Sequence, residues 1–309
     1  MASHWRPLAL VFAVALLALS ALSCARRESS QGPRGGTTIQ QIGSTTLLPI
    51  AERWAKVFHE EHPEIRIALS GGGSGTGIKA LIAGTADIAN SSRKIKQQEL
   101  EQARQAGVEP VEHIVAYDGI AAIVNPKNPV RELSLRQLSD IYCGAISNWR
   151  AVGGEDREIV VVGRDSASGT YEAFKELVVT LGGRETQRDY CPETLQQASN
   201  QAVVDTVAQS EAAIGYVGLG YVTEKVKALR IAAEGGEPVA PTVENVASGA
   251  YPISRALYMY TRGQPQGAVR TYLQWCLSEK GQAIVRELGF VPVSEGAGAK
   301  QSPAPPRGA

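Results

Sequence analysis

A strand pattern, a glycine-rich loop and a helix pattern follow one another in the stretch Ile65-Arg-Ile-Ala-Leu-Ser-Gly-Gly-Gly-Ser-Gly-Thr-Gly-Ile-Lys-Ala-Leu-Ile-Ala83. Apolar residues alternate over 65–69, which predicts a strand, and a helix is predicted over 77–83. A similar change from an apolar run to small polar residues recurs at Gly43-Ser-Thr-Thr46 and Ser166-Ala-Ser-Gly-Thr170. Repeated units of strand, loop and helix are typical of an α/β fold.

The three loops share a chemistry that suits an oxyanion. The first turn of a helix has N–H groups without intrahelical partners and a partial positive charge, so an anion can bind there without a metal or a buried lysine. Hydroxyl groups rotate to donate to oxyanion oxygens, and glycine lets the backbone approach the ion. If several such helix ends converge, they can hold a phosphate-sized ion without its water.

The other predicted elements continue the alternation, and a second unit of the fold is predicted to begin near Gly119. Strands are predicted at 38–42, 87–90, 111–117, 120–124, 159–163, 214–217 and 255–260. Helices are predicted at 48–60, from 97, and at 134–142, 170–180, 265–277 and 278–288.

The N-terminus has the pattern of a secretory signal. A basic start precedes an apolar stretch at 8–19, which is too short for a membrane-spanning helix, and small residues and Cys24 follow. Residues 1–23 are therefore predicted to be a cleaved signal peptide, and Cys24 the lipidated first residue of a bacterial lipoprotein. Ala21 and Leu22 depart from the usual lipoprotein signal, so plain secretion stays an alternative.

Polar segments set the limits of the folded core. Residues 24–36 predict a flexible tether and residues 294–309 a disordered tail, because neither has apolar periodicity. The core between them, about 37–293, is long enough for two domains with a cleft. Its remaining cysteines leave a disulfide between Cys143 and Cys191 open, whereas the helical pattern around Cys276 predicts a buried thiol.

The charges exclude several function classes. The 31 Lys and Arg residues balance 31 Asp and Glu residues, and no block of one sign is present. This balance argues against binding to nucleic acid and against a surface that binds a membrane.

The sequence also lacks the common catalytic and metal-binding motifs. Four scattered histidines give no metal cluster and no Ser-His-Asp arrangement, and no G-x-S-x-G motif is present. Gly75-Thr-Gly-Ile-Lys-Ala80 meets the dinucleotide pattern only as an isolated string. We therefore expect no cofactor, no metal and no enzymatic activity.

Seven segments carry a resemblance to a known family, and they cover almost all of the core in order. The chain is similar there to the phosphate-binding protein of bacterial phosphate ABC transporters. The segments are Gly43-Ser-Thr-Thr-Leu-Leu-Pro49, Ser70-Gly-Gly-Gly-Ser-Gly-Thr-Gly77, Asp87-Ile-Ala-Asn-Ser-Ser-Arg93, Tyr117-Asp-Gly-Ile-Ala121, Ile141-Tyr-Cys-Gly-Ala-Ile-Ser-Asn-Trp149, Gly163-Arg-Asp-Ser-Ala-Ser-Gly-Thr170 and Tyr251-Pro-Ile-Ser254.

The resemblance implies a two-lobed periplasmic-binding-protein fold of type II, with two hinge crossovers and the ligand in the cleft between the lobes. Residues 37–117 and 251–293 would form lobe 1, and residues 118–250 lobe 2. The implied function is capture of inorganic phosphate in the periplasm or elsewhere outside the cytoplasm, and delivery to the permease subunits of an ABC importer. Such a binder works as a monomer and would touch the membrane only through its lipid.

The family's phosphate contacts map onto seven residues of this chain. Arg164 would supply a planar, charge-assisted contact and the single permanent positive charge of the site. Arg93 is not assigned a contact. The seven residues are Thr45, Thr46 through its N–H, Ser74, Arg164, Ser168, Gly169 and Thr170.

One position departs from the longer members of the family, where an aspartate accepts the proton of phosphate. That position is Ser92 here, which can contribute only a hydroxyl, and Asp118 at the predicted crossover is the replacement that we expect. Phosphate retains a proton near neutral pH and sulfate does not, so an acceptor favours phosphate. Alternatives that stay open are sulfate, molybdate or tungstate as ligand, a secreted phosphoesterase, and an anion sensor without transport.

Overall fold

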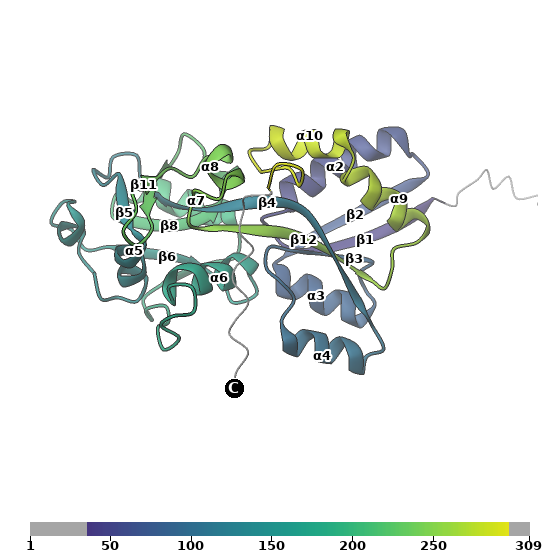
Figure 1. Cartoon of the computed structure of the whole chain (residues 1–309), viewed down its shortest axis with the longest axis horizontal. Helices are drawn as coiled ribbons and strands as arrows, with labels where there is room; N and C mark the ends of the chain where they lie inside the picture. The colour runs from purple at the N-terminus through teal and green to yellow at the C-terminus, as the bar shows by residue number, and fades with distance from the viewer. Residues whose placement is uncertain (1–35, 297–309) are drawn as a thin grey trace, which may run out of the picture. The chain divides into compact units, whose positions relative to one another are not determined.

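The computed structural model describes residues 36–296 (Figure 1). The predicted signal peptide, the lipidation of Cys24 and almost all of the predicted tether lie outside the described residues, as do residues 297–309 of the predicted tail. Residues 294–296 lie in a turn, in which the N–H groups of Glu295 and Gly296 donate to Pro292 O at 3.0 and 3.1 Å. None of the helices between residues 36 and 296 combines the length and the hydrophobicity that a membrane-spanning segment needs.

A long mixed sheet runs through the fold, with its strands in the order β2-β1-β3-β12-β4-β8-β6-β7 and with β9 beside β4. The pairs of β1 with β2 and β3, and of β6 with β7 and β8, are parallel, whereas β12 and β8 run antiparallel to β4. The strands are β1 (Thr37–Gly43), β2 (Ile65–Gly72), β3 (Ile88–Ser91), β4 (Pro110–Val124), β6 (Val160–Arg164), β7 (Leu195–Gln197), β8 (Ala213–Gly218), β9 (Lys227–Ala228) and β12 (Ser254–Arg262). A second, small sheet contains β5 (Glu132–Ser134), β10 (Arg230–Ala232) and β11 (Pro238–Val239).

Helices follow most of the parallel strands, which confirms the α/β prediction. They are α2 (Leu48–Glu61), α3 (Ser74–Ala83), α4 (Gln97–Gln105), α5 (Leu135–Tyr142), α6 (Gly169–Phe174), α7 (Asn200–Gln209), α8 (Val243–Ala247), α9 (Gly267–Cys276) and α10 (Glu279–Glu287). Short 3-10 helices lie at Trp149–Val152 and Leu219–Tyr221, and α6 continues into a π-helix at Lys175–Val179. The helix α7 was not predicted from the sequence.

Two groups of apolar side chains lie at opposite ends of the long sheet. Trp54 and Phe58 of α2 are fully buried in one group, and Phe174 stacks on Tyr216 in the other, with ring centroids 3.9 Å apart. The strands β4 and β12 run between the two ends (Figure 1). The described residues from Thr37 onward nevertheless form one compact unit, so the predicted lobe boundaries stay a prediction.

The prediction of two strands separated near Gly119 was wrong, because β4 is continuous from Pro110 to Val124. Only its partner changes, from β12 up to Gly119 to β8 from Ile120 onward. A Cβ atom on Gly119 would lie 2.7 Å from Val246 Cγ2, so glycine is needed here for the close approach of α8 and not for a turn.

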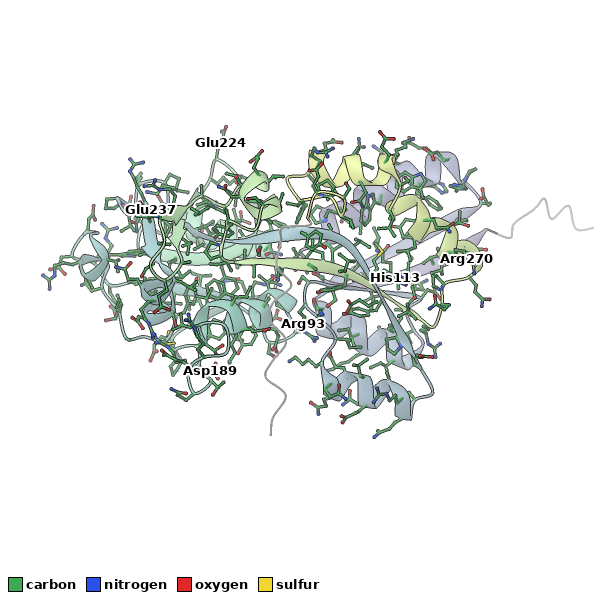
Figure 2. The ribbon with its side chains drawn as sticks, in the orientation of Figure 1. Arg93, His113, Asp189, Glu224, Glu237 and Arg270 are labelled. Carbon is green, nitrogen blue, oxygen red and sulfur yellow. The ribbon has the colours of Figure 1, made fainter. Side chains whose placement is uncertain are left out.

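Polar side chains also join β4 to β12. His113 lies in the first half of β4 (Figure 2). Its Nε2 lies 3.0 Å from Thr261 Oγ1 of β12. Burial lowers the pKa of His113, so its ring is neutral near neutral pH. This histidine therefore has a partner within the sheet.

The three cysteines among the described residues are free thiols. Cys276 is fully buried in α9, as the helical pattern predicted. Cys191 is also buried and lies 3.2 Å from Thr194 Oγ1, whereas Cys143 Sγ accepts a hydrogen bond from Arg188 Nε at 3.3 Å. The disulfide that the sequence left open is not formed in this structure.

Candidate functional site

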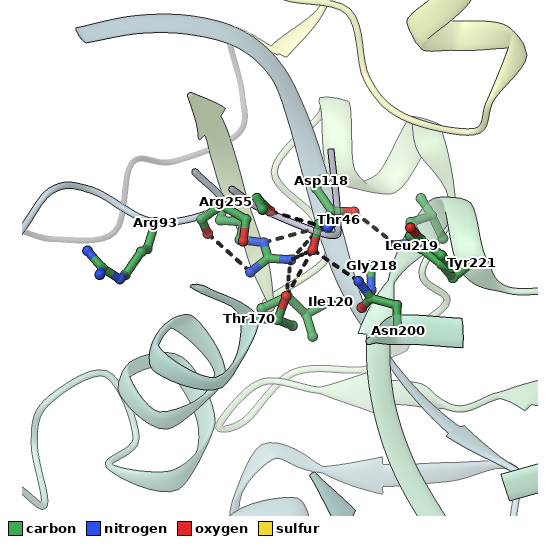
Figure 3. Close-up of polar contacts among 12 residues, drawn as sticks. Thr46, Arg93, Asp118, Ile120, Thr170, Asn200, Gly218, Leu219, Tyr221 and Arg255 are labelled. Carbon is green, nitrogen blue, oxygen red and sulfur yellow. Dashed lines mark hydrogen bonds and ion pairs between the residues drawn. The ribbon is translucent and has the colours of Figure 1, made fainter. Parts of the chain in front are cut away.

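The three loops that the sequence singled out meet in space. Thr45 and Thr46 lie between β1 and α2, Ser74 begins α3 after β2, and the loop after β6 leads into α6. Because β1 and β2 are parallel neighbours, their carboxyl ends lie at the same edge of the sheet. The loop after β6 reaches them from the other end of the sheet, because Thr46 Oγ1 lies 3.0 Å from Thr170 Oγ1 (Figure 3). In addition, Gly75 N donates to Ala167 O at 3.1 Å.

The start of α6 packs directly on the start of α3. A Cβ atom on Gly169 would lie 2.2 Å from Ser74 Oγ and 2.6 Å from Ser92 Oγ, so only glycine fits there. Ser74 Oγ in turn accepts the N–H of Ser92 at 3.0 Å. Two buried helix N-termini therefore face each other, and each carries N–H groups and partial positive charge.

Ser168 caps α6. Its Oγ accepts the N–H groups of Thr170 and Tyr171 at 3.1 and 3.3 Å, and the side chain is buried. A hydroxyl that accepts two hydrogen bonds still has its own hydrogen to donate. Ser168 can therefore cap the helix and donate to a bound ion at the same time.

Arg164 is almost fully buried, and its guanidinium group is incompletely bonded. Nε donates to Gln197 O at 3.0 Å, and Nη2 donates to Ala198 O at 3.0 Å and Thr45 Oγ1 at 3.1 Å. Nη1 has no hydrogen-bond partner among the described residues. Burial lowers the pKa of Arg164, which means that its charge is poorly solvated. A buried charged donor without an acceptor is costly, so an anion is the missing partner that this geometry indicates.

Asp118 lies in the middle of β4, where the strand changes partners, and it is fully buried. Its Oδ1 accepts the N–H of Leu219 at 2.9 Å, and its Oδ2 accepts Nε and Nη2 of Arg255 at 3.2 and 2.8 Å. Burial raises the pKa of Asp118, while the Arg255 charge and the Leu219 N–H act against that rise.

Sequence reasoning missed Arg255, which is 4% exposed on β12. Its Nη1 donates to Ser92 O at 3.1 Å, and its Nη2 lies 3.1 Å from Thr170 Oγ1 and 3.4 Å from Thr46 Oγ1. The expectation of a single positive charge was therefore wrong: two guanidinium groups and one carboxylate lie together. The sequence nevertheless contains a sign of this role. Arg255 directly follows the motif Tyr251-Pro-Ile-Ser254, and it is a charged residue in an otherwise apolar stretch of β12.

Two further polar residues were missed. Asn200 at the start of α7 donates to Thr46 Oγ1 at 3.3 Å, and its Oδ1 accepts the N–H of Gly218 at 3.3 Å. The Tyr221 hydroxyl donates to Thr45 O at 2.5 Å. Because α7 itself was not predicted, no feature of the sequence placed Asn200 near the loops.

Arg93 follows Ser92 but pairs elsewhere. Its Nη1 and Nη2 donate to the two carboxylate oxygens of Glu99 at 2.8 and 2.7 Å. This bidentate pair is compatible with the expectation that Arg93 makes no ligand contact. In the range 36–296, no group of three or more His, Cys, Asp or Glu residues is placed to hold a metal ion.

The chain has clear relatives. A family model described as a PBP superfamily domain matches residues 28–280. The phosphate-binding protein PstS of Bacillus subtilis strain 168 is 35% identical over 263 residues, which cover 84% of this chain and 82% of the relative. The PstS protein of Pseudomonas aeruginosa PAO1 is 32% identical over 294 residues, or 89% of each chain.

Solved structures agree with these relatives. A phosphate ABC transporter substrate-binding protein of Clostridium perfringens, described with bound phosphate, has a TM-score of 0.74 at 33% identity and covers 83% of this chain and 100% of its own. An ABC-type phosphate transport receptor from Vibrio cholerae has a TM-score of 0.65 at 32% identity, over 82% and 99% of the two chains. The fold is thus that of the periplasmic binding proteins. Within that class, the chain belongs to the family of PstS phosphate-binding proteins.

Proposed function

We propose that this protein captures inorganic phosphate outside the cytoplasmic membrane and delivers it to the permease subunits of an ABC importer, without catalysing a reaction. The names of its relatives support phosphate as the ligand and ABC transport as the setting. The single observation that carries the proposal in this chain is the buried Nη1 of Arg164, which has no partner among the described residues. The same guanidinium group contacts Thr45, and the loop of Thr45 and Thr46 in turn contacts the start of α6.

A phosphate ion at this place would supply the acceptor oxygens for the donors there. We assign its contacts to Arg164 Nη1, to hydroxyl groups, and to N–H groups at the N-terminal ends of α2, α3 and α6. Such an array replaces the hydration shell of the ion with fixed dipoles and one guanidinium contact. The proposed ligand residues are Thr45, Thr46, Ser74, Ser92, Arg164, Ser168, Gly169 and Thr170.

Asp118 is the proposed acceptor for the proton that phosphate retains. A carboxylate oxygen accepts about two hydrogen bonds. Oδ2 already accepts two from Arg255, whereas Oδ1 accepts only one, from Leu219. Oδ1 is therefore the atom that can accept the ion's hydrogen, and this requirement would exclude sulfate.

Capture is proposed to involve closure of two lobes, 37–117 with 251–293 and 118–250. Several hydrogen bonds cross between these segments, including those from Tyr221 to Thr45 and from Arg164 to Thr45. The ion pair of Lys96 with Glu172, at 2.7 Å, crosses as well. An ion that bonds to both segments stabilises this closed arrangement, which the permease would then recognise.

The N-terminal pattern completes the proposal. Lipidation of Cys24 after cleavage of residues 1–23 would tether the protein to a membrane, with no other membrane contact. Intact mass spectrometry of the membrane-extracted protein tests this, since the mass of a diacylglyceryl-modified chain beginning at Cys24 is expected. A chain that retains residues 1–23 would contradict it.

Isothermal titration calorimetry of the mature chain tests the ligand. The protein is first stripped of bound anion by partial unfolding and refolding, and then titrated with phosphate, sulfate and molybdate. Tight binding of phosphate and far weaker binding of sulfate are expected. A response to sulfate or molybdate alone would keep the site and change the ion, whereas no response at all would contradict an oxyanion site. Phosphate uptake by cells that lack this protein then tests delivery.

A further inference from the structure

Arg255 and Asp118 form a buried ion pair that lies beside the ligand loops. Two N–H groups of Arg255 bind Asp118 Oδ2, and the two side chains are 4% and 0% exposed. The same guanidinium group donates to Ser92 O and to Thr170 Oγ1, both at 3.1 Å. Figure 3 shows Thr170 beside Arg255. Arg255 therefore contacts a carboxylate and two of the ligand loops at once.

We propose that Arg255 is the residue that sets oxyanion specificity: by binding Asp118 through two N–H groups, it holds this carboxylate as an anion that accepts the ligand's hydrogen. This inference rests on the proposed function, because it names how the same site distinguishes hydrogen phosphate from sulfate. Arg255 is a positioning residue here, since it acts through Asp118 and Thr170.

Two opposing effects act on Asp118. Burial favours the protonated acid, and the Arg255 charge favours the carboxylate. Without Arg255, a fully buried carboxyl group takes up a proton and becomes a hydrogen-bond donor. A donor at this place suits sulfate, whereas an ionised acceptor repels it and leaves it without a hydrogen bond. The side chain at position 255 therefore decides which ion fits.

Other titratable groups near Asp118 do not replace Arg255. Tyr221 and Tyr251 lie close enough to interact with the Asp118 charge, but burial raises the pKa of each, so both stay neutral near physiological pH. Arg164 lies near Arg255, and no hydrogen bond joins it to Asp118 among the described contacts. Arg255 is thus the cation that pairs with this carboxylate.

Arg255 also orients the hydroxyl groups beside the ligand. Its Nη2 donates toward Thr170 Oγ1 and, at 3.4 Å, toward Thr46 Oγ1. These oxygens lie 3.0 Å apart, so one hydroxyl group donates its hydrogen to the other. The hydrogen of the accepting hydroxyl group is not used in this contact, and it can be donated to an oxygen of the ion.

The test compares the dissociation constants for phosphate and sulfate of the mature wild-type chain and three variants by calorimetry. Arg255→Met should weaken phosphate binding by roughly 100-fold. The binding of sulfate should weaken less than that of phosphate. The dissociation constant for sulfate divided by that for phosphate should therefore fall at least about tenfold. Arg255→Lys keeps a cation beside Asp118 and should keep most of that ratio. Arg262→Met, at the exposed end of the same strand, should change neither constant.

An equal loss for both ions in Arg255→Met would overturn the proposal, because Arg255 would then supply only positive charge. If that variant does not fold, Arg255→Met combined with Asp118→Asn removes both charges of the pair, so neither partner is left as an unpaired buried charge. Its amide can donate to sulfate, so the lowered ratio must appear there too, and an unchanged ratio again overturns the proposal. A wild-type chain that binds no phosphate rejects the proposed function and this inference together, whereas tight wild-type binding with unchanged ratios rejects only the role of Arg255.

Discussion

The side-chain oxygens of Thr46 and Thr170 lie 3.0 Å apart, although 124 positions separate the two residues in the chain. Thr46 follows β1 and Thr170 lies in α6, so their contact joins loops from the two ends of the long sheet. Both oxygens also lie within reach of Arg255 Nη2. The site is therefore built from loops that come from both ends of the sheet.

Replacing Gly169 by alanine should weaken phosphate binding. The added Cβ would lie 2.2 Å from Ser74 Oγ, so α6 has to move away from α3. A strained contact of this kind costs about 1–3 kcal/mol, which corresponds to a rise of roughly 5- to 150-fold in the dissociation constant. Calorimetry measures it, and Gly236→Ala is the control, because its Cβ would lie 3.6 Å from the nearest atom. Equal affinities of the two variants would contradict the assigned packing.

Replacing Arg164 by methionine should remove a charged donor from the ion. A hydrogen bond to a charged group is worth about 2 kcal/mol, which corresponds to roughly a 30-fold loss of affinity. Arg150→Met serves as the control, because the Arg150 side chain is 72% exposed and pairs with Asp156. The Tm values of both variants, measured by differential scanning calorimetry, show whether a loss of affinity comes from unfolding or from the missing contact. Wild-type affinity in a folded Arg164→Met protein would show that Arg164 does not bind the ion.

Replacing Tyr221 by phenylalanine should speed the release of phosphate. The change deletes the hydrogen bond from the Tyr221 hydroxyl to Thr45 O, which crosses between the two predicted lobes. A loss of about 1 kcal/mol from the closed form corresponds to roughly a fivefold faster release, measured by stopped-flow fluorescence. Tyr171→Phe is the matched control, since its ring stacks on Tyr190 and its hydroxyl makes no hydrogen bond among the described contacts. If both variants release phosphate at the wild-type rate, the Tyr221 bond does not stabilise closure.

Acid stability should depend on Glu99. Burial acts to raise the pKa of Glu99, but the Arg93 guanidinium and the Lys96 N–H outweigh it and hold the pKa below 4.5. A carboxyl group with a lowered pKa in the folded state stabilises the protein above its unfolded pKa, and this contribution is lost as pH falls through the folded value. Glu99→Gln should therefore flatten the loss of Tm on acidification below about pH 4.5.

The exposed Glu101→Gln is the control for that measurement, because Glu101 lies on the same helix. Its Tm should fall with pH as steeply as that of the wild type. If the Tm of all three proteins falls equally as the pH is lowered, the Arg93–Glu99 pair contributes nothing to stability.

Much of the local structure followed from the sequence. Alternating apolar residues predicted β2, and glycine with hydroxyl residues predicted the loops before α3 and α6, because backbone preferences act over a few positions. The break at Gly119 was predicted wrongly, since a glycine in a strand signals either a turn or a close contact. Its neighbour Val246, which explains that glycine, is distant in the chain.

The sequence by itself determined the α/β class, the loop chemistry and, through seven motifs, a resemblance to phosphate-binding proteins. The tertiary structure alone decided that Arg255 pairs with Asp118, that Asn200 reaches Thr46, and that Arg164 has a buried donor to offer. A pattern of residues shows which side chains are apolar or charged and how they alternate. It does not show which residue from another part of the chain will lie opposite, because strand order and packing set those contacts.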